Sequence, residues 1–184
     1  MWMTAYQNGW GVEVDIRTHL GEMFLSHDPI ESDLHQTVSF NHFLDFAMSW
    51  SNTTVLDFKE SGLIHRVDRA PHIVCTDLIV PDQLTAKELG IRTLSRRSKY
   101  EDINVGQYQL YGPAKRWNLP EEYWIDYVYS SEDLHKYESV AKQSYVVSSE
   151  LHGCYLTLEF IKAVYTMGFL GVCTDHPERY AEYA

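Results

Sequence analysis

The stretch GVEVDIRTHLGEMFLSHD, residues 11–28, decides the fold that this sequence predicts. Glu13 and Asp15 lie two residues apart in an alternating run, so both point to one face of a strand, while Val14 between them points to the other face. Two carboxylates on one face of a buried strand repel each other unless a cation or protons lie between them. Because Mg²⁺ and Ca²⁺ prefer oxygen ligands, the pair indicates a metal-binding strand. The alternative is an exposed edge strand with a polar face.

A turn, a short strand and a histidine follow the acidic pair. THLGEM is typical of a turn, residues 23–25 of a short strand, and Asp28-Pro29 of a second turn that leaves His27 at the strand end. Histidine is the usual general acid or base near neutral pH. A lone histidine is most often structural, but the acidic pair before His27 favours a catalytic role.

The composition is that of an ordinary soluble globular protein and favours one domain, with 184 residues, 45% of them hydrophobic. Fifteen basic and 26 acidic residues give a net charge of −11, which repels nucleic acid and anionic membranes at long range. No apolar run is long enough to span a membrane and no signal peptide is recognisable, so we expect a cytoplasmic protein without stable membrane insertion.

Short β-branched runs alternate with longer amphipathic stretches along the chain. Strands are expected at residues 11–17, 23–26, 53–59, 72–78, 91–95, 123–128, 144–148 and 170–174. Helices are expected at residues 40–50, 81–89, 130–140 and 156–167. This alternation predicts an α/β fold with a parallel sheet or barrel.

Most of the expected strands end in a polar or charged residue. These residues are Asp15, Asp57, Asp77, Arg96, Asp126, Glu150 and Asp175. Catalytic groups of (β/α)₈ barrels gather at the C-terminal ends of the strands, whereas a single carboxylate often only caps the next helix. The recurrence of such residues favours the barrel.

Three motifs follow one another in a fixed order. The first is E-x-D followed by an apolar triplet and H-D in residues 11–28, the second is VLDFK at residues 55–59, and the third is GVCTDHP at residues 171–177. In this order they resemble the glycerophosphodiester phosphodiesterase family of the phospholipase-C-like phosphodiesterases. A short bacterial subgroup is similar over nearly the whole chain, including SRRSKYED, YWIDYV and YVVSSELHG.

The resemblance implies a TIM (β/α)₈-type barrel and metal-dependent hydrolysis of a small polyol or glycerol phosphodiester. It implies that Glu13, Asp15 and Asp57 hold one divalent cation, Mg²⁺ or Ca²⁺. It also implies that His27 transfers a proton and that Lys59 is the active-site lysine.

Further residues are candidates for substrate binding. Arg96 can form a bidentate contact with a phosphate, or a buried ion pair with Glu101 or another neighbouring acid. Trp124 and Asp126 can line the pocket, although core packing is at least as common for tryptophan. Glu150, and with it His152, can contact substrate hydroxyls or cap the following helix.

One family segment is missing from this sequence. Family members begin with a strand ending in H-R-G, whose histidine is the acid–base partner of the one corresponding to His27. The present sequence opens with MWMTAYQNGWG, which resembles the end of the first helix running into the second strand. We therefore expect a single barrel domain over residues 1–184 that lacks the first strand and most of the first helix.

The missing segment has three explanations: a start codon assigned too late, a fragment, or a degenerate homologue. The first is favoured because the other catalytic residues look intact. The competing functional hypothesis is a catalytically impaired or non-catalytic homologue that binds a metal or a phosphorylated ligand.

Overall fold

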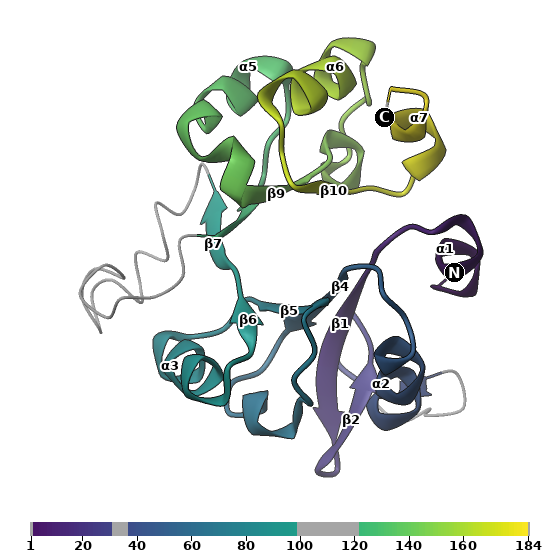
Figure 1. The fold of residues 1–184 in the computed structure, drawn as a ribbon, viewed down its shortest axis with the longest axis vertical. Helices are drawn as coiled ribbons and strands as arrows, with labels where there is room; N and C mark the ends of the chain where they lie inside the picture. Colours follow the sequence, from purple (N-terminus) through teal and green to yellow (C-terminus); the bar gives the residue numbers. More distant parts are fainter. Residues whose placement is uncertain (1, 31–36, 99–121, 184) are drawn as a thin grey trace. The chain divides into compact units, whose positions relative to one another are not determined.

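The computed structural model describes residues 2–30, 37–98 and 122–183, which form two compact units. Unit 1 contains the described residues up to Leu94, and unit 2 contains those from Ser95 onward. Each unit has a sheet with parallel strands and helices between them (Figure 1). The predicted α/β class is therefore confirmed.

Unit 1 is built around a six-stranded sheet in the order β3-β2-β1-β4-β5-β6. Strands β1, β4, β5 and β6 are parallel neighbours, whereas β2 pairs antiparallel with β1 and β3. The elements are α1 (Trp2–Asn8), β1 (Val12–His19), β2 (Glu22–Leu25), β3 (Val38–Ser39), α2 (Phe40–Met48), β4 (Thr54–Phe58), a 3₁₀ turn (Ile64–Arg66), β5 (Ile73–Thr76), α3 (Val80–Leu89) and β6 (Arg92–Thr93).

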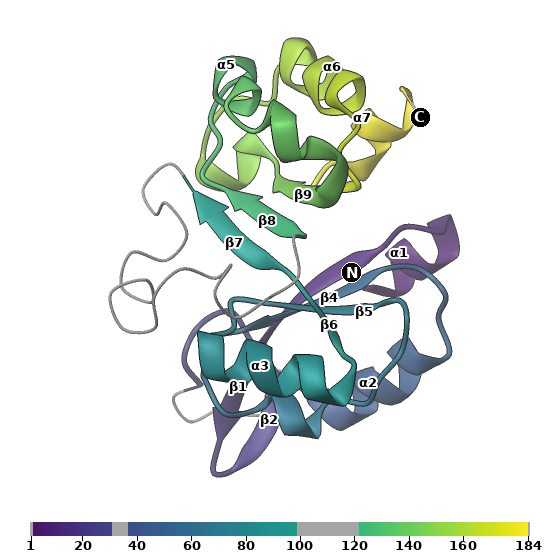
Figure 2. The same cartoon turned by 60° about the vertical axis from the view of Figure 1, so that its left-hand side comes forward.

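One face of this sheet packs against helices α2 and α3 (Figure 2). Ile16 and Leu56 from the strands share a buried cluster with Phe43 of α2 and Ala86 of α3. Because side chains alternate along a strand, the residues next to these in sequence lie on the opposite face. That face therefore carries the acidic side chains of β1 and β4.

A tight hairpin joins β1 to β2. His19 pairs with Glu22, which leaves Leu20 and Gly21 as the two turn residues. Both have positive φ, 52° and 83°, as a type I′ turn requires. Glycine adopts this conformation freely, whereas Leu20 is an uncommon residue there.

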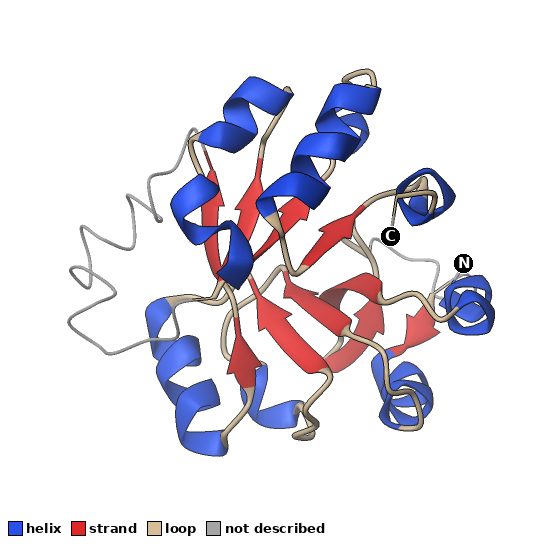
Figure 3. Cartoon of the chain, turned by 45° about the horizontal axis from the view of Figure 1, so that its top comes forward, coloured by secondary structure: helices blue, strands red, loops and turns tan. Residues whose placement is uncertain are grey.

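Unit 2 is built around a four-stranded parallel sheet in the order β10-β9-β8-β7. Its buried cluster joins Ile125 and Val146 of the sheet to Leu134 of α5 and Phe160 of α6. In each unit helices, blue in Figure 3, cover strands, drawn in red. The elements are β7 (Ser95–Ser98), β8 (Tyr123–Asp126), α5 (Ser131–His135), a 3₁₀ helix (Glu138–Gln143), β9 (Ser144–Val147), a 3₁₀ helix (Ser149–His152), α6 (Leu158–Met167), β10 (Gly171–Cys173) and α7 (Pro177–Ala181).

The predicted strands are all present, with one difference in the strands and two in the helices. The strand expected at residues 91–95 is divided into β6 and β7, because Leu94 N–H donates to Cys75 O whereas Ser95 N–H donates to Glu122 O. The helix expected at residues 130–140 ends at His135 and is followed by a 3₁₀ helix. The helix α7 was not predicted.

Neither sheet closes on itself within the described residues. The (β/α)₈ barrel and the single domain over residues 1–184 therefore stay predictions. Among the same residues, every helix is too short or too polar to cross a bilayer.

Candidate metal centre

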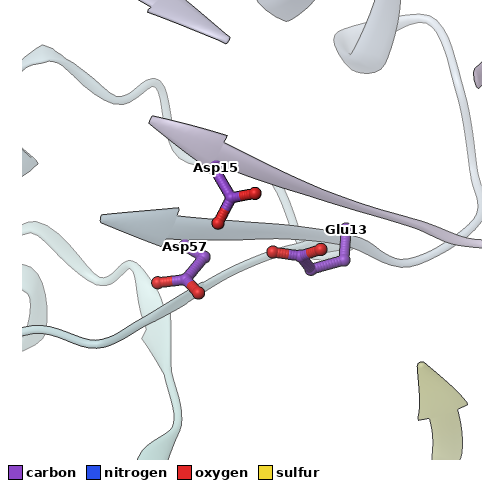
Figure 4. Close-up of side chains that lie close together, drawn as sticks. All are labelled: Glu13, Asp15 and Asp57. Carbon is purple, nitrogen blue, oxygen red and sulfur yellow. The ribbon is translucent and has the colours of Figure 1, made fainter. Parts of the chain in front are cut away.

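Three carboxylates converge on one face of the unit 1 sheet. Strands β1 and β4 are parallel, with Asp15 beside Asp57 and Glu13 two residues earlier on β1. One ligand oxygen from each of the three side chains lies within 4.8 Å of the others (Figure 4). The pattern of alternating residues in the sequence thus becomes a group of oxygen ligands spaced for one ion.

The positively charged side chain of Lys59 lies against these carboxylates. Its Nζ lies 2.7 Å from Asp15 Oδ1 and 2.8 Å from Asp57 Oδ2. Burial lowers the pKa of Lys59, but hydrogen bonds to the two aspartates outweigh this and raise that pKa above its usual value. Lys59 is therefore a stable cation that bridges two of the three carboxylates.

One lysine does not balance the surrounding negative charge. Burial, together with the charges of Asp15 and Asp57, raises the pKa of Glu13 to about 8. Burial and the charge of Asp77 raise the pKa of Asp57 to about 6. Without a metal, Glu13 therefore holds a proton at neutral pH, and a bound cation would displace that proton.

One oxygen of Asp57 has no partner among the described residues. This Oδ1 is buried and forms no hydrogen bond with them, while the residue as a whole is only 7% exposed. Buried polar atoms nearly always have a partner, so an orphaned carboxylate oxygen needs an explanation. A hard cation coordinated by Asp57, Asp15 and Glu13 provides one, and the donor set fits Mg²⁺ or Ca²⁺.

A fourth acid lies beside this group. Asp77 follows the last residue of β5, and Thr76 of that strand is in register with Asp57. The charge of Asp77 contributes to the raised pKa values of Asp57 and Glu13. Its position after a strand was visible in the sequence, but nothing there distinguished it from the other strand-end acids.

His27 lies beside the carboxylate-bearing strand without touching the carboxylates. Ser26 N–H donates to Asp15 O at 3.0 Å, and Arg17 Nε donates to His27 O at 2.8 Å. The imidazole itself is 76% exposed, and its Nδ1 lies 3.0 Å from Asp28 Oδ1. Among the described residues its side chain makes no other polar contact.

The candidate substrate-binding residues belong to unit 2. Arg96 Nη2 lies 2.6 Å from Asp126 Oδ2, so two of them form an ion pair with each other. Trp124 is buried, and Glu150 accepts hydrogen bonds from the hydroxyls of Ser148 and Thr174. Glu101, the alternative partner for Arg96, lies outside the described residues.

The sequence offered His152, with Glu150, as a candidate for contact with a substrate hydroxyl, but it did not predict the partner of His152. Its Nε2 lies 2.9 Å from Asp126 Oδ1, which makes it a second partner of that carboxylate. Nothing in the sequence indicated this pairing.

No protein-family model, curated protein sequence or solved structure matches this chain. The function of the chain is therefore inferred from its side-chain geometry and its sequence motifs.

Proposed function

We propose that this chain is a metal-dependent phosphodiester hydrolase of the glycerophosphodiester phosphodiesterase type, acting on a small polyol or glycerol phosphodiester. The observation that carries the proposal is the convergence of Glu13, Asp15 and Asp57, with one Asp57 oxygen buried and unpartnered. Cleavage of a phosphodiester moves negative charge onto the phosphoryl and leaving oxygens. A site that gathers a divalent cation and a lysine suits that charge.

The roles follow from the chemistry of each side chain. Glu13, Asp15 and Asp57 hold one Mg²⁺ or Ca²⁺, which supplies Lewis-acid stabilisation of a phosphate oxygen. Lys59, which bridges the two aspartates, adds a second positive charge toward the phosphate. His27 transfers the proton to or from the reacting oxygen, because its exposed imidazole is free to turn toward a substrate.

We also propose that the strands of both units belong to a (β/α)₈-type barrel. Parallel strands follow the chain order in both sheets, from β1 through β4, β5 and β6 and then from β7 to β10. Only Leu94 separates β6 from β7 in the sequence.

A second candidate function is binding of a metal or a phosphorylated ligand without turnover. The observation that favours it is the position of His27, whose side chain contacts only Asp28 among the described polar groups. Removing one of two acid–base groups typically costs about 10²–10⁴ in rate. A site with His27 as its one acid–base histidine can therefore bind a ligand without measurable turnover.

Hydrolysis of bis(p-nitrophenyl) phosphate with added Mg²⁺ or Ca²⁺ separates the two functions. The hydrolase is expected to release p-nitrophenol, and both His27→Ala and removal of the metal are expected to abolish the release. His42→Ala, at an exposed position on α2, is the matched control and should keep the activity. Cleavage that survives His27→Ala, or that persists after chelation, contradicts the mechanism. Metal binding without cleavage supports the second function.

A further inference from the structure

Unit 2 holds a second group of titratable side chains, which the proposed hydrolysis does not explain. Asp126 is the last residue of β8, and His152 is the last residue of the 3₁₀ helix that follows β9. Their side chains are 11% and 12% exposed, and His152 Nε2 lies 2.9 Å from Asp126 Oδ1. The pair is therefore largely shielded from water.

The contacts of Asp126 fix which imidazole nitrogen carries the proton. Arg96 Nη2 lies 2.6 Å from Asp126 Oδ2, and Tyr127 N–H donates to Asp126 Oδ1 at 2.8 Å. Tyr127 N also lies 3.1 Å from His152 Nε2. If Nε2 accepted that hydrogen, its lone pair would face the carboxylate oxygen at 2.9 Å, an acceptor against an acceptor. The proton therefore lies on Nε2, which donates to Asp126.

An imidazole with its one proton on Nε2 has a lone pair on Nδ1. Nδ1 forms no hydrogen bond with the described residues, and it is not among their buried unpartnered atoms. Nδ1 is therefore partly exposed. An imidazole whose tautomer is set by a carboxylate presents its other nitrogen to a ligand in a fixed state.

The imidazole is also held in place by aromatic rings. The Tyr127 ring stacks on it with a centroid distance of 4.9 Å and an interplanar angle of 22°, and the Tyr129 ring meets it edge-on at 5.7 Å. Tyr127 has φ of 54°, a left-handed conformation that is unfavourable for a residue with a side chain. Such strain is found where the surrounding contacts require it, and it is common at binding sites.

We propose that His152 is the centre of a binding site for an uncharged polyol, in which Nδ1 accepts a hydrogen bond from a ligand hydroxyl. Among the described residues, the charges of Arg96 and Asp126 balance each other, so this ion pair adds no net positive charge to attract an anion. A fixed lone pair requires a donor, and the rings of Tyr127 and Tyr129 provide apolar surface beside it. The site contains none of the proposed metal ligands, but Arg96 and Asp126 are also candidate substrate-binding residues, so the choice of a polyol rests on the proposed function. Binding of the polyol itself can be measured without hydrolysis.

Nitrogen NMR of the imidazoles in the metal-free full-length chain tests the tautomer and the ligand together. Nε2 of His152 is expected to carry the proton, and its Nδ1 signal is expected to shift on titration with glycerol, saturating with a Kd on the order of 10 mM for so small a ligand. The signals of His135, an exposed residue of α5, serve as the internal control. Inorganic phosphate at the same concentrations should leave His152 unchanged.

Two variants keep the test decisive. In His152→Gln, the amide signals of Tyr127 and Tyr129 should lose their response to glycerol, whereas His135→Gln should retain it. In Asp126→Asn, the amide can donate to Nε2, so the proton is expected to move to Nδ1, which then donates to a glycerol hydroxyl instead of accepting from it, and the Nδ1 shift on titration should differ from that of the wild type. A proton on Nδ1 in the wild type, a response to phosphate alone, or His152 signals that follow those of His135 at every glycerol concentration would overturn the proposal.

Discussion

Unit 1 and unit 2 both place an aspartate near the end of a parallel strand and give it a basic partner, but the two clusters differ in charge balance. In unit 1, Lys59 is shared by Asp15 and Asp57, with Glu13 close by. In unit 2, the single carboxylate of Asp126 is shared by Arg96 and His152. The first cluster has too many carboxylates for its cation, and the second has enough donors for its carboxylate.

The difference shows what each cluster requires from outside the protein. An excess of buried negative charge raises the pKa of Glu13 to about 8 and leaves an Asp57 oxygen without a partner, so unit 1 is completed by a cation. Both carboxylate oxygens of Asp126 have protein partners, so among the described residues this cluster leaves no carboxylate oxygen for a cation, and its unpartnered atom is Nδ1 of His152.

The largest expected effect is on metal affinity in unit 1. Asp57→Asn removes a ligand charge and the unpartnered buried oxygen, so the affinity for Mg²⁺, Ca²⁺ or Mn²⁺ should fall by at least about 100-fold, or about 2.7 kcal/mol. Isothermal titration calorimetry measures this change. Asp45→Asn, at an exposed position on α2, is the matched control. Equal metal affinities in the two variants would show that Asp57 is not a metal ligand.

The next expected effect is a loss of folding stability on substitution of Asp126 in unit 2. Asp126→Asn weakens the hydrogen bonds from Arg96 and His152 and leaves the guanidinium charge without its counter-ion. The free energy of unfolding should fall by about 2 kcal/mol, below the range for fully buried pairs because Arg96 is partly exposed. Urea denaturation gives the value. An unchanged midpoint and slope would show that the pair adds nothing to stability.

The next expected effect is a rise in metal affinity in unit 1 when Lys59 is removed. In Lys59→Met the ammonium no longer repels a bound dication, and this gain exceeds the loss of carboxylate orientation. Affinity for Mn²⁺ should therefore rise by about tenfold. Lys87→Met, at an exposed position on α3, should leave the affinity at the wild-type value. Weaker binding by Lys59→Met would mean that the lysine mainly orients the ligands.

The remaining expected effect is the pH dependence of stability without metal. The pKa of Glu13 is about 8 in the folded chain against an ordinary 4.5, so the folded state binds more protons between these values. Stability from this group is complete below about pH 4.5 and is lost as the pH rises through 8. Glu13→Gln has no such loss, so its free energy of unfolding should fall less than that of the wild type between pH 4.5 and pH 8.5.

Thermal unfolding in the presence of a chelator measures this difference, with Glu88→Gln on the exposed part of α3 as the control. If Glu13→Gln and the wild type unfold at the same temperature at both pH values, then Glu13 titrates normally and the excess of negative charge in unit 1 is smaller than its geometry indicates.

Much of the fold could be predicted because local patterns determine it. The strands are short β-branched or apolar runs, and the turn at Leu20-Gly21 separates two of them. The division between β6 and β7 could not be predicted, because the sequence there is continuous and only the choice of partner strand changes at Leu94. The antiparallel pairing of β2 also depends on the hairpin that fixes its register rather than on its own residues.

The candidate site was predictable to the extent that it follows strand register. Glu13 and Asp15 share a face by simple alternation, and Asp57 joins them because β4 is the parallel neighbour of β1. His152 could not be identified in the same way, since its contact with Asp126 depends on a left-handed Tyr127 and on the 3₁₀ helix after β9. Neither conformation has a recognisable signature in the sequence.

The hairpin between β1 and β2 has a consequence for conformational entropy. Hydrogen bonds from Arg17 to His27 O and from Ser26 to Asp15 O hold the backbone at His27, while its side chain remains 76% exposed. A ligand that engages the imidazole then has to fix only two side-chain torsions, at a cost of about 0.5–1.5 kcal/mol. The main-chain ordering has already taken place during folding, so His27 acts as a tethered group at high local concentration.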